Sequence, residues 1–265
     1  MATKTVVNVM ADAATAGVGP LILSEAERLL VQRPTARFLA APWLNSIEAG
    51  GIADTLSGAY AAPIVSGIRP SRHETGGPDG APWYQALAAD PVGGLMTNTG
   101  VVNAGGDWTL AVVGKASTNL GGVLLGIGGA AGGAHGICLR SDDKMVFKRY
   151  TATGPTGLDL AIISGITTAD WHLVVVSYKP SATTFTIWID GVEVHHVTNQ
   201  SITPGTSKLT LFSTYDPSAS PALSADADEG GIAAAWCFAE YAGDNSDALL
   251  DLIQTAALDR FPTLY

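Results

Sequence analysis

The feature that most constrains the fold is a series of short apolar runs that fills the chain from about residue 84 onward. Each run has the length of one β-strand, and glycine, proline or polar turn residues separate it from the next. The runs are DWTLAVVGKAS, GGVLLGIGG, HGICLRSDDKMVFKRY, LDLAIISG, WHLVVVSYKP, FTIWIDGVEVHHV, KLTLFST and GGIAAAWCFAEY. Regularly spaced short strands of this kind predict an all-β sandwich or barrel.

Composition agrees with such a fold and limits the partners. Charged residues make up 14% of the 265 residues, while 31 glycines and 14 prolines supply turns. The formal net charge of -10 argues against nucleic acid as a partner, because phosphate binding needs a basic patch. No apolar run approaches the roughly 18 residues of a membrane span, and the first residues lack the architecture of a signal peptide. We therefore expect no membrane span and no export by a standard secretion signal.

The best-defined hairpin is WHLVVVSYKPSATTFTIWIDGVEV, residues 171–194. Its second half alternates, so that Trp188 faces away from the apolar side chains beside it. Asp190 and Gly191 then predict a tight turn, since glycine takes positive φ without a steric penalty. In the first half, residues 173–176 are apolar on both faces, as in a strand buried between two layers. This stretch is expected to be a central hairpin that mainly serves burial.

The front of the chain has a different texture, and we expect an N-terminal arm over residues 1–83 ahead of a sandwich domain over residues 84–265. Residues 1–83 carry six Lys or Arg and seven Asp or Glu, whereas the remainder carries eight and seventeen. LSEAERLLVQRP predicts one short helix, in which Ser24 and Glu27 form a capping box. The loop-like HETGGPDGAP then marks the boundary.

The end of the chain, DNSDALLDLIQTAALDRF, switches to a helical period and predicts a short C-terminal helix. Asn245 or Ser246 would cap it. Two cysteines, Cys138 and Cys237, lie in predicted strands far apart in the sequence. We expect them to be buried free thiols, with a disulfide between them as the alternative.

Residues 171–194 resemble the hairpin of laminin G-like, or concanavalin A-like, jelly-roll domains, in which Trp-His opens a strand, Tyr ends it and the next strand closes on Asp-Gly. DWTLAVVGKAS, GICLRSDDKMVFKRY and GGIAAAWCFAEYAGDNSDALLDLI follow in the family's order. The resemblance covers roughly residues 84–265. It implies a two-sheet antiparallel jelly-roll sandwich with one curved face and a short C-terminal helix, and it leaves the N-terminal extension, residues 1–83, unexplained. Lectins, glycosidases, adhesion modules and structural domains all use this frame.

Two sets of residues are candidates for binding. Alternation turns Trp188 towards the face where the resemblance implies a ligand, and aromatic rings stack well on sugars. Packing against a neighbouring strand or loop is the alternative for this side chain. Arg28, Arg33 and Arg37 accompany the predicted N-terminal helix and are candidates for docking onto an acidic partner, with a solvated helix face as the alternative.

The acidic loops provide the candidates for a metal site. Asp226 and Asp228, in SADADEGG, would bind calcium, because the resemblance implies an ion at the rim of some such domains. Asp142 and Asp143 form a second acidic pair, and solvated loop acids are the alternative for both pairs. Apart from calcium we expect no cofactor. The same SADADEGG acids lack the apolar strand context of a glycosidase pair, so we expect no enzyme activity.

Three functions follow from this frame. By analogy with proteins of tailed-phage particles, the leading hypothesis is a non-enzymatic virion structural protein, a capsid decoration or a tail or fibre component. It would be made in the host cytoplasm, dock onto other virion proteins through residues 1–83, belong to an oligomer or larger assembly, and display the sandwich for adhesion. The second hypothesis is a carbohydrate-binding module that grips a host-surface glycan at Trp188. The third is a glycoside hydrolase, with Asp226 and Asp228 as its acids.

Overall fold

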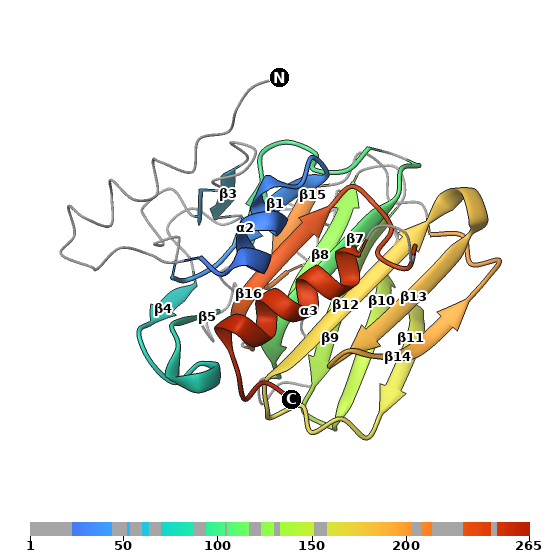
Figure 1. The fold of residues 1–265 in the computed structure, drawn as a ribbon. Helices are drawn as coiled ribbons and strands as arrows, with labels where there is room; N and C mark the ends of the chain where they lie inside the picture. The colour runs from blue at the N-terminus through green and yellow to red at the C-terminus, as the bar shows by residue number, and fades with distance from the viewer. Residues whose placement is uncertain are drawn as a thin grey trace.

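The computed structural model describes residues 23–43, 52–53, 60–63, 70–86, 94–103, 105–116, 123–129, 133–150, 158–202, 208–213, 230–244 and 248–265. These residues form two antiparallel sheets that pack face to face, with two helices on the outer side of one sheet (Figure 1). The predicted all-β sandwich is therefore confirmed, together with its C-terminal helix and the short helix near the front. Within the described residues, no helix has the length and apolar character needed to cross a bilayer.

The first sheet runs through the centre of the molecule and carries the site described below. From one edge to the other its strands are β14 (Val192–Val197), β13 (Thr184–Ile189), β12 (His172–Lys179), β7 (Trp108–Lys115), β16 (Gly231–Phe238), β5 (Trp83–Gln85) and β4 (Ser71–His73), and β1 (Ala36–Ala40) also pairs with β16. Every pairing is antiparallel. The predicted hairpin forms β12 and β13.

The second sheet covers the inner face of the first. Its strands, in order, are β11 (Leu158–Ser164), β10 (Lys144–Tyr150), β9 (Gly133–Arg140), β8 (Leu125–Gly129), β15 (Lys208–Leu211), β6 (Leu95–Thr97), β3 (Tyr60–Pro63) and β2 (Ile52–Ala53). Two short 3-10 turns, η1 (Pro78–Gly80) and η2 (Pro180–Ala182), lie in connections.

Strands that precede residue 84 belong to both sheets. The edge of β16 that faces away from β7 pairs with β5 near its start and with β1 near its end, so the two short strands share one partner. β2 and β3 extend the second sheet. The sandwich thus uses strands from both sides of the boundary expected at residue 83. Residues 1–22 lie outside the described part of the chain, and the anchoring role expected for residues 1–83 stays a prediction.

β12 is buried on both faces, as its apolar run predicts. Val174 and Val176 point between the sheets, into a core that includes the large side chains of Trp108 and Phe185. Alternate side chains of the same strand point outward and meet the helices. Burial of apolar surface on both faces stabilises this strand by roughly 1.5–3 kcal/mol for each large side chain.

The two helices α2 (Glu25–Gln32) and α3 (Leu249–Arg260) cover the outer face of the first sheet, side by side (Figure 1). The predicted capping box at the start of α2 is present: Glu27 N donates to Ser24 Oγ at 3.2 Å, and Ser24 N donates to Glu27 Oε2 at 2.8 Å. Glu27 also pairs with Arg260 of α3, whose Nη2 lies 2.7 Å from Glu27 Oε2. This buried carboxylate therefore joins the first helix to the last.

The start of α3 differs from its prediction. The helix begins at Leu249 after Ala248, which has φ 49° and no side-chain hydrogen bond to the helix. Asn245 and Ser246, the expected caps, precede the helix and lie outside the described residues. Both cysteines are buried free thiols, as expected, with Cys237 in the core between the sheets and Cys138 in a separate small cluster.

Candidate functional site

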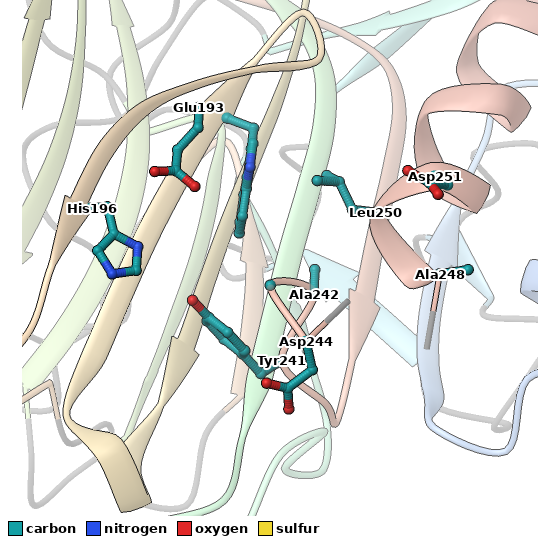
Figure 2. Close-up of a pocket in the computed structure, with 10 residues that line it drawn as sticks. Glu193, His196, Tyr241, Ala242, Asp244, Ala248, Leu250 and Asp251 are labelled. Atoms are coloured by element: carbon teal, nitrogen blue, oxygen red, sulfur yellow. The ribbon is translucent and has the colours of Figure 1, made fainter. Parts of the chain in front are cut away.

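A pocket of about 170 Å³ lies on the outer face of the first sheet, at its β13–β14 edge beside the start of α3. The hairpin residues of the pocket meet there with the turn after β16 and the start of α3, which lie about fifty positions later in the sequence. Figure 2 shows Glu193 and His196 on one side of the pocket, with Leu250 and Asp251 on the other. The lining residues are Trp188, Glu193, His196, Tyr241, Ala242, Gly243, Asp244, Ala248, Leu250 and Asp251.

A row of polar side chains crosses the outer face of the sheet and ends at this pocket. Thr109 on β7 pairs in register with Ser177 on β12, Ser177 with Thr186 on β13, and Thr186 with His196 on β14. Side chains that pair in register share one face of a sheet. The hydroxyl oxygens of Thr109 and Ser177 lie 2.7 Å apart, and Thr186 Oγ1 lies 3.0 Å from His196 Nδ1.

This polar row holds the segment that follows β16. Thr109 Oγ1 donates to the carbonyl oxygen of Glu240 at 2.7 Å, and Ala242 N donates to Ser177 Oγ at 2.9 Å. Between them, the Tyr241 hydroxyl lies 2.7 Å from Thr186 Oγ1. Buried polar groups need partners of this kind, since each unpaired group costs on the order of 1–3 kcal/mol. The row therefore fixes the position of the Tyr241 ring against the sheet.

Two further contacts complete the turn after Tyr241. Gly243 lies directly against the Tyr241 ring, where an added Cβ atom would come within 2.5 Å of three side-chain atoms of the tyrosine. Asp244 binds Lys179 of β12, with 2.6 Å between Nζ and Oδ2. The turn is thus held at both ends, by the polar row and by this ion pair.

Two aromatic side chains contribute to the pocket while most of their surface is buried. Trp188 is 5% exposed and Tyr241 is 7% exposed. As alternation predicts, Trp188 faces away from the core between the sheets and packs in the outer cluster beside apolar residues of β12 and α3. In the described part of the chain its indole nitrogen makes no hydrogen bond, and the residue lines the pocket.

The charges around the pocket are mainly negative. Glu193, Asp244 and Asp251 place three carboxylates in its lining, and His196 contributes the one imidazole. Burial raises the pKa of Tyr241, and the carboxylates of Asp244 and Glu193 act in the same direction against the opposing effect of Thr186. Tyr241 therefore stays protonated at neutral pH.

The three arginines predicted to dock a partner do not converge. Arg33 forms an ion pair with Glu240, beside the turn after β16. Arg28 binds Glu25 and Gln32 of its own helix, with 44% of its side chain exposed. Arg37 donates to backbone carbonyl oxygens near its own position. Docking through these arginines stays a prediction, and the structure gives Arg33 an internal role.

The predicted calcium ligands Asp226 and Asp228 lie outside the described residues, so the calcium site also stays a prediction. Asp142, of the second acidic pair, forms ion pairs with two basic side chains. Its Oδ2 atom lies 2.5 Å from Lys144 Nζ and 3.0 Å from Arg140 Nη2. The hydrogen bond from Lys144 lowers the pKa of Asp142. In the ranges that the structure describes, no cluster of three or more His, Cys, Asp or Glu side chains is arranged to hold a metal.

Sequence reasoning identified Trp188 but not the other walls of the pocket. Strict alternation would put Glu193 and His196 on opposite faces of β14, and the bulge in this strand brings them to the same face, beside Trp188 and Thr186. Tyr241 and Gly243 carried only a weak local signal in the sequence. They are an aromatic residue and a glycine that follow shortly after an apolar strand. Nothing in the sequence linked those residues to the hairpin.

Comparisons with known proteins give no family and no close relative: no protein-family model and no curated protein matches the chain. Similar solved structures exist. The binding domain of botulinum neurotoxin DC, in complex with rat synaptotagmin II, has a TM-score of 0.55 at 11% identity over 84% of this chain and 52% of that chain. The same binding domain in complex with SialylT has a TM-score of 0.54 at 10% identity, over 88% and 52%.

A third similar structure is that of botulinum neurotoxin type C, a toxin whose cell entry is dependent upon interaction with two ganglioside molecules. Its TM-score is 0.51 at 11% identity, over 83% of this chain and 51% of that chain. The chain thus spans about half the length of each of these structures. At this level of identity the likeness concerns the fold: this chain has a β-sandwich similar to those found in the toxin structures.

Proposed function

We propose that this protein is a carbohydrate-binding module and that the pocket beside Trp188 and Tyr241 is its glycan site. The observation that carries the proposal is the convergence of two aromatic side chains and several hydrogen-bonding groups on one small pocket of the outer face. Glycan sites combine an apolar surface for the sugar ring with a few placed polar groups for its hydroxyls. The pocket volume of about 170 Å³ is on the scale of one sugar ring.

Each wall of the pocket has a part in this proposal. The indole N–H of Trp188 donates to a ligand oxygen, while the carboxylates of Glu193 and Asp251 accept from sugar hydroxyls. His196 has Nδ1 within 3.0 Å of Thr186 Oγ1, which leaves Nε2 for the ligand. Tyr241 is already bound to the sheet and contributes ring surface. The arrangement suits a neutral, hydroxyl-rich ligand held without covalent chemistry.

The fold comparisons support the same proposal. One of the similar structures was solved with SialylT, and another comes from a toxin whose cell entry depends on two ganglioside molecules. Those ligands belong to the toxins, and the fold alone does not carry a ligand from one protein to another. These structures support the proposal because they show that a similar sandwich can occur in a glycan-binding protein.

A glycan array followed by titration calorimetry tests the proposal. We expect wild-type protein to bind at least one glycan class, and Glu193→Gln or His196→Ala to weaken that binding about tenfold, the effect of losing one good hydrogen bond. Both residues are exposed on β14, so their replacement leaves the core intact. Val192→Ala, on the same strand but outside the pocket, is the matched control. Binding of no glycan, or equal binding by all four proteins, would contradict the proposal.

The three carboxylates raise hydrolysis as a second candidate, since glycosidases use a pair of them. The general acid of such enzymes is usually held in apolar surroundings, which keep it protonated. Here Glu193 and Asp251 are exposed, and Asp244 is paired with Lys179. These surroundings favour binding over cleavage. Release of reducing sugar from a bound glycan, abolished in Glu193→Gln or Asp251→Asn, would establish the enzyme instead.

A role as a virion component stays a prediction that rests on analogy. The anchor is expected within residues 1–83, and residues 1–22 are the part to remove first, because residues 23–43 contact the sandwich through α2 and β1. A protein lacking residues 1–22 should fold and bind glycan as the full chain does, but fail to join particles. Normal incorporation of the shortened protein would contradict the anchoring role.

A further inference from the structure

The charges lining the pocket bear on which sugars it takes, and this inference rests on the proposed function. Three of the ten lining residues are acidic, and no lysine or arginine is among them. Glu193 and Asp251 have no ion-pair partner in the described part of the chain, and both are exposed at the mouth of the pocket. A ligand that enters therefore meets two uncompensated carboxylates.

Lys179, which binds the lining residue Asp244, is already engaged in an ion pair. Lys179 lies 2.6 Å from Asp244 Oδ2, and this hydrogen bond is the largest contribution that raises the pKa of Lys179. Lys179 could donate a second N–H to an acidic sugar, but its single positive charge would then be shared between that sugar and Asp244. The ion pair thus neutralises one acid but supplies no spare positive charge.

The start of α3 is the other source of positive potential. A helix N-terminus carries about half an elementary charge, and Ala248 and Leu250 bring this end to the pocket. Asp251, in the first turn of the same helix, places a full negative charge beside it. The carboxylate more than offsets the helix dipole, so the net potential at this wall stays negative.

The pocket also has a hydrogen-bond donor, the indole N–H of Trp188, which by itself accepts neutral and charged partners alike. Trp188 lines the pocket, is only 5% exposed, and its indole nitrogen makes no hydrogen bond within the described residues. A sugar hydroxyl, an amide carbonyl or a carboxylate would satisfy this donor. The discrimination against acids therefore comes from Glu193 and Asp251, which accept from hydroxyl or ammonium groups.

We infer that the pocket selects neutral sugars and sugars with a free amino group, and that it rejects sialylated and other acidic glycans. A like charge near an exposed carboxylate weakens binding by roughly fivefold to tenfold, and two such carboxylates face the ligand. This selectivity is opposite to what the SialylT complex of a similar fold would suggest. The difference lies in the side chains of this pocket.

Matched glycan pairs test the selectivity. Lactose is compared with sialyllactose, and N-acetylglucosamine oligomers with their de-N-acetylated counterparts, each by calorimetry at low and at physiological salt. We expect the neutral member of the first pair to bind at least about tenfold more tightly than the acidic one. We expect the amino-bearing member of the second pair to bind at least as tightly as the neutral one at low salt and to weaken as salt rises.

Variants connect the selectivity to the two acids. Glu193→Gln combined with Asp251→Asn should reduce the neutral-to-acidic affinity ratio by about tenfold or more, whereas Asp259→Asn, an exposed acid further along α3, should leave the ratio unchanged. Tighter binding of sialyllactose by wild-type protein, or a ratio that the double variant leaves unchanged, would overturn the inference while the proposed glycan site stands. Binding of no glycan of either charge would remove the proposed function itself.

Discussion

The hydroxyl of Tyr241 lies 2.7 Å from Thr186 Oγ1, and this contact joins the turn after the last strand to the middle of the β12–β13 hairpin. The two residues are 55 positions apart in the chain. Thr186 belongs to a row of side chains on neighbouring strands, so the tyrosine is held by the sheet as a whole. The contact holds the turn against the outer face of the sheet, where residues 241–244 form one wall of the pocket.

Replacing Tyr241 with phenylalanine removes this bond and leaves the ring. We expect the free energy of unfolding to fall by about 1–2 kcal/mol, the usual cost of losing a buried hydrogen bond whose partner remains. Urea denaturation measures the change. Tyr265→Phe, at an exposed position, is the matched control. If the free energy of unfolding falls by a similar amount in both variants, the hydrogen bond of Tyr241 to Thr186 does not stabilise the fold as expected.

Gly243 should matter for ligand binding as well as for stability. An alanine there would bring Cβ within 2.5 Å of the Tyr241 side chain, so either the ring or the turn must move. Gly165→Ala provides the comparison: its φ of 82° strains the backbone, but no atom lies within 4 Å of the added Cβ. We expect both variants to lower the melting temperature, and Gly243→Ala alone to weaken glycan binding. Equal glycan affinity in the two variants would show that the position of the Tyr241 ring does not affect glycan binding.

His172 and Asp190 predict a pH-dependent contribution from the hairpin. Burial acts to lower the pKa of His172, but the hydrogen bond from its Nδ1 to Asp190 Oδ2, at 2.6 Å, contributes to a net rise above 6.5. A raised histidine pKa stabilises the fold fully below the unfolded value and loses that effect as pH rises through the folded value.

The Asp190→Asn variant checks this contribution. Asparagine tolerates the left-handed backbone of this position, where φ is 50°, and keeps an acceptor for Leu173 N. The variant should lose more stability at about pH 5.5 than at about pH 9, where His172 is largely neutral in both states. Its His172 signal in an NMR titration should move to a lower pKa. A stability loss that is equal at both pH values would contradict the charged pair.

His135 should act in the opposite direction. Burial between the sheets, with a smaller effect of Arg149, lowers its pKa from 6.5 to about 3, and both ring nitrogens lack partners in the described residues. The unfolded chain therefore binds the proton first, and stability falls by about 1.4 kcal/mol for each unit as pH drops from 6.5 towards 3.

Two replacements of His135 separate charge from polarity. His135→Leu and His135→Gln both remove the titrating group, so both should flatten the acid limb of the stability curve. His135→Leu should in addition raise the free energy of unfolding at neutral pH by about 1–3 kcal/mol, because it removes unpaired buried polar atoms. Denaturation across the pH range measures both effects. If the free energy of unfolding falls as steeply with decreasing pH in the two variants as in the wild type, groups other than His135 cause the acid sensitivity.

Much of the sandwich was predictable because its signals are local. The period-2 alternation around Trp188 gave the side of the sheet that this residue occupies, and the apolar residues on both faces of β12 gave its place between two layers. Ser24 and Glu27 predicted a helix start that the structure contains. Each of these features involves residues close together in sequence, whose spacing carries the information.

The pairing of the front strands and the pocket could not be predicted in this way. β1 is a five-residue strand whose partner, β16, lies nearly two hundred positions later. The start of α3 follows Ala248 in a left-handed conformation that glycine or asparagine usually takes, so the cap rules point to the wrong residues. The pocket combines β14, the turn at Tyr241 and α3, and only the fold brings these segments together.

The indole N–H signal of Trp188 provides the most direct test of the glycan site. In a ¹H–¹⁵N NMR spectrum this signal can be assigned by its disappearance in Trp188→Phe, and the other five tryptophans serve as internal controls. Titration with the neutral glycan that gives the strongest array signal should shift the Trp188 indole signal and leave the others in place. A glycan that binds while the Trp188 signal stays unmoved would contradict the account.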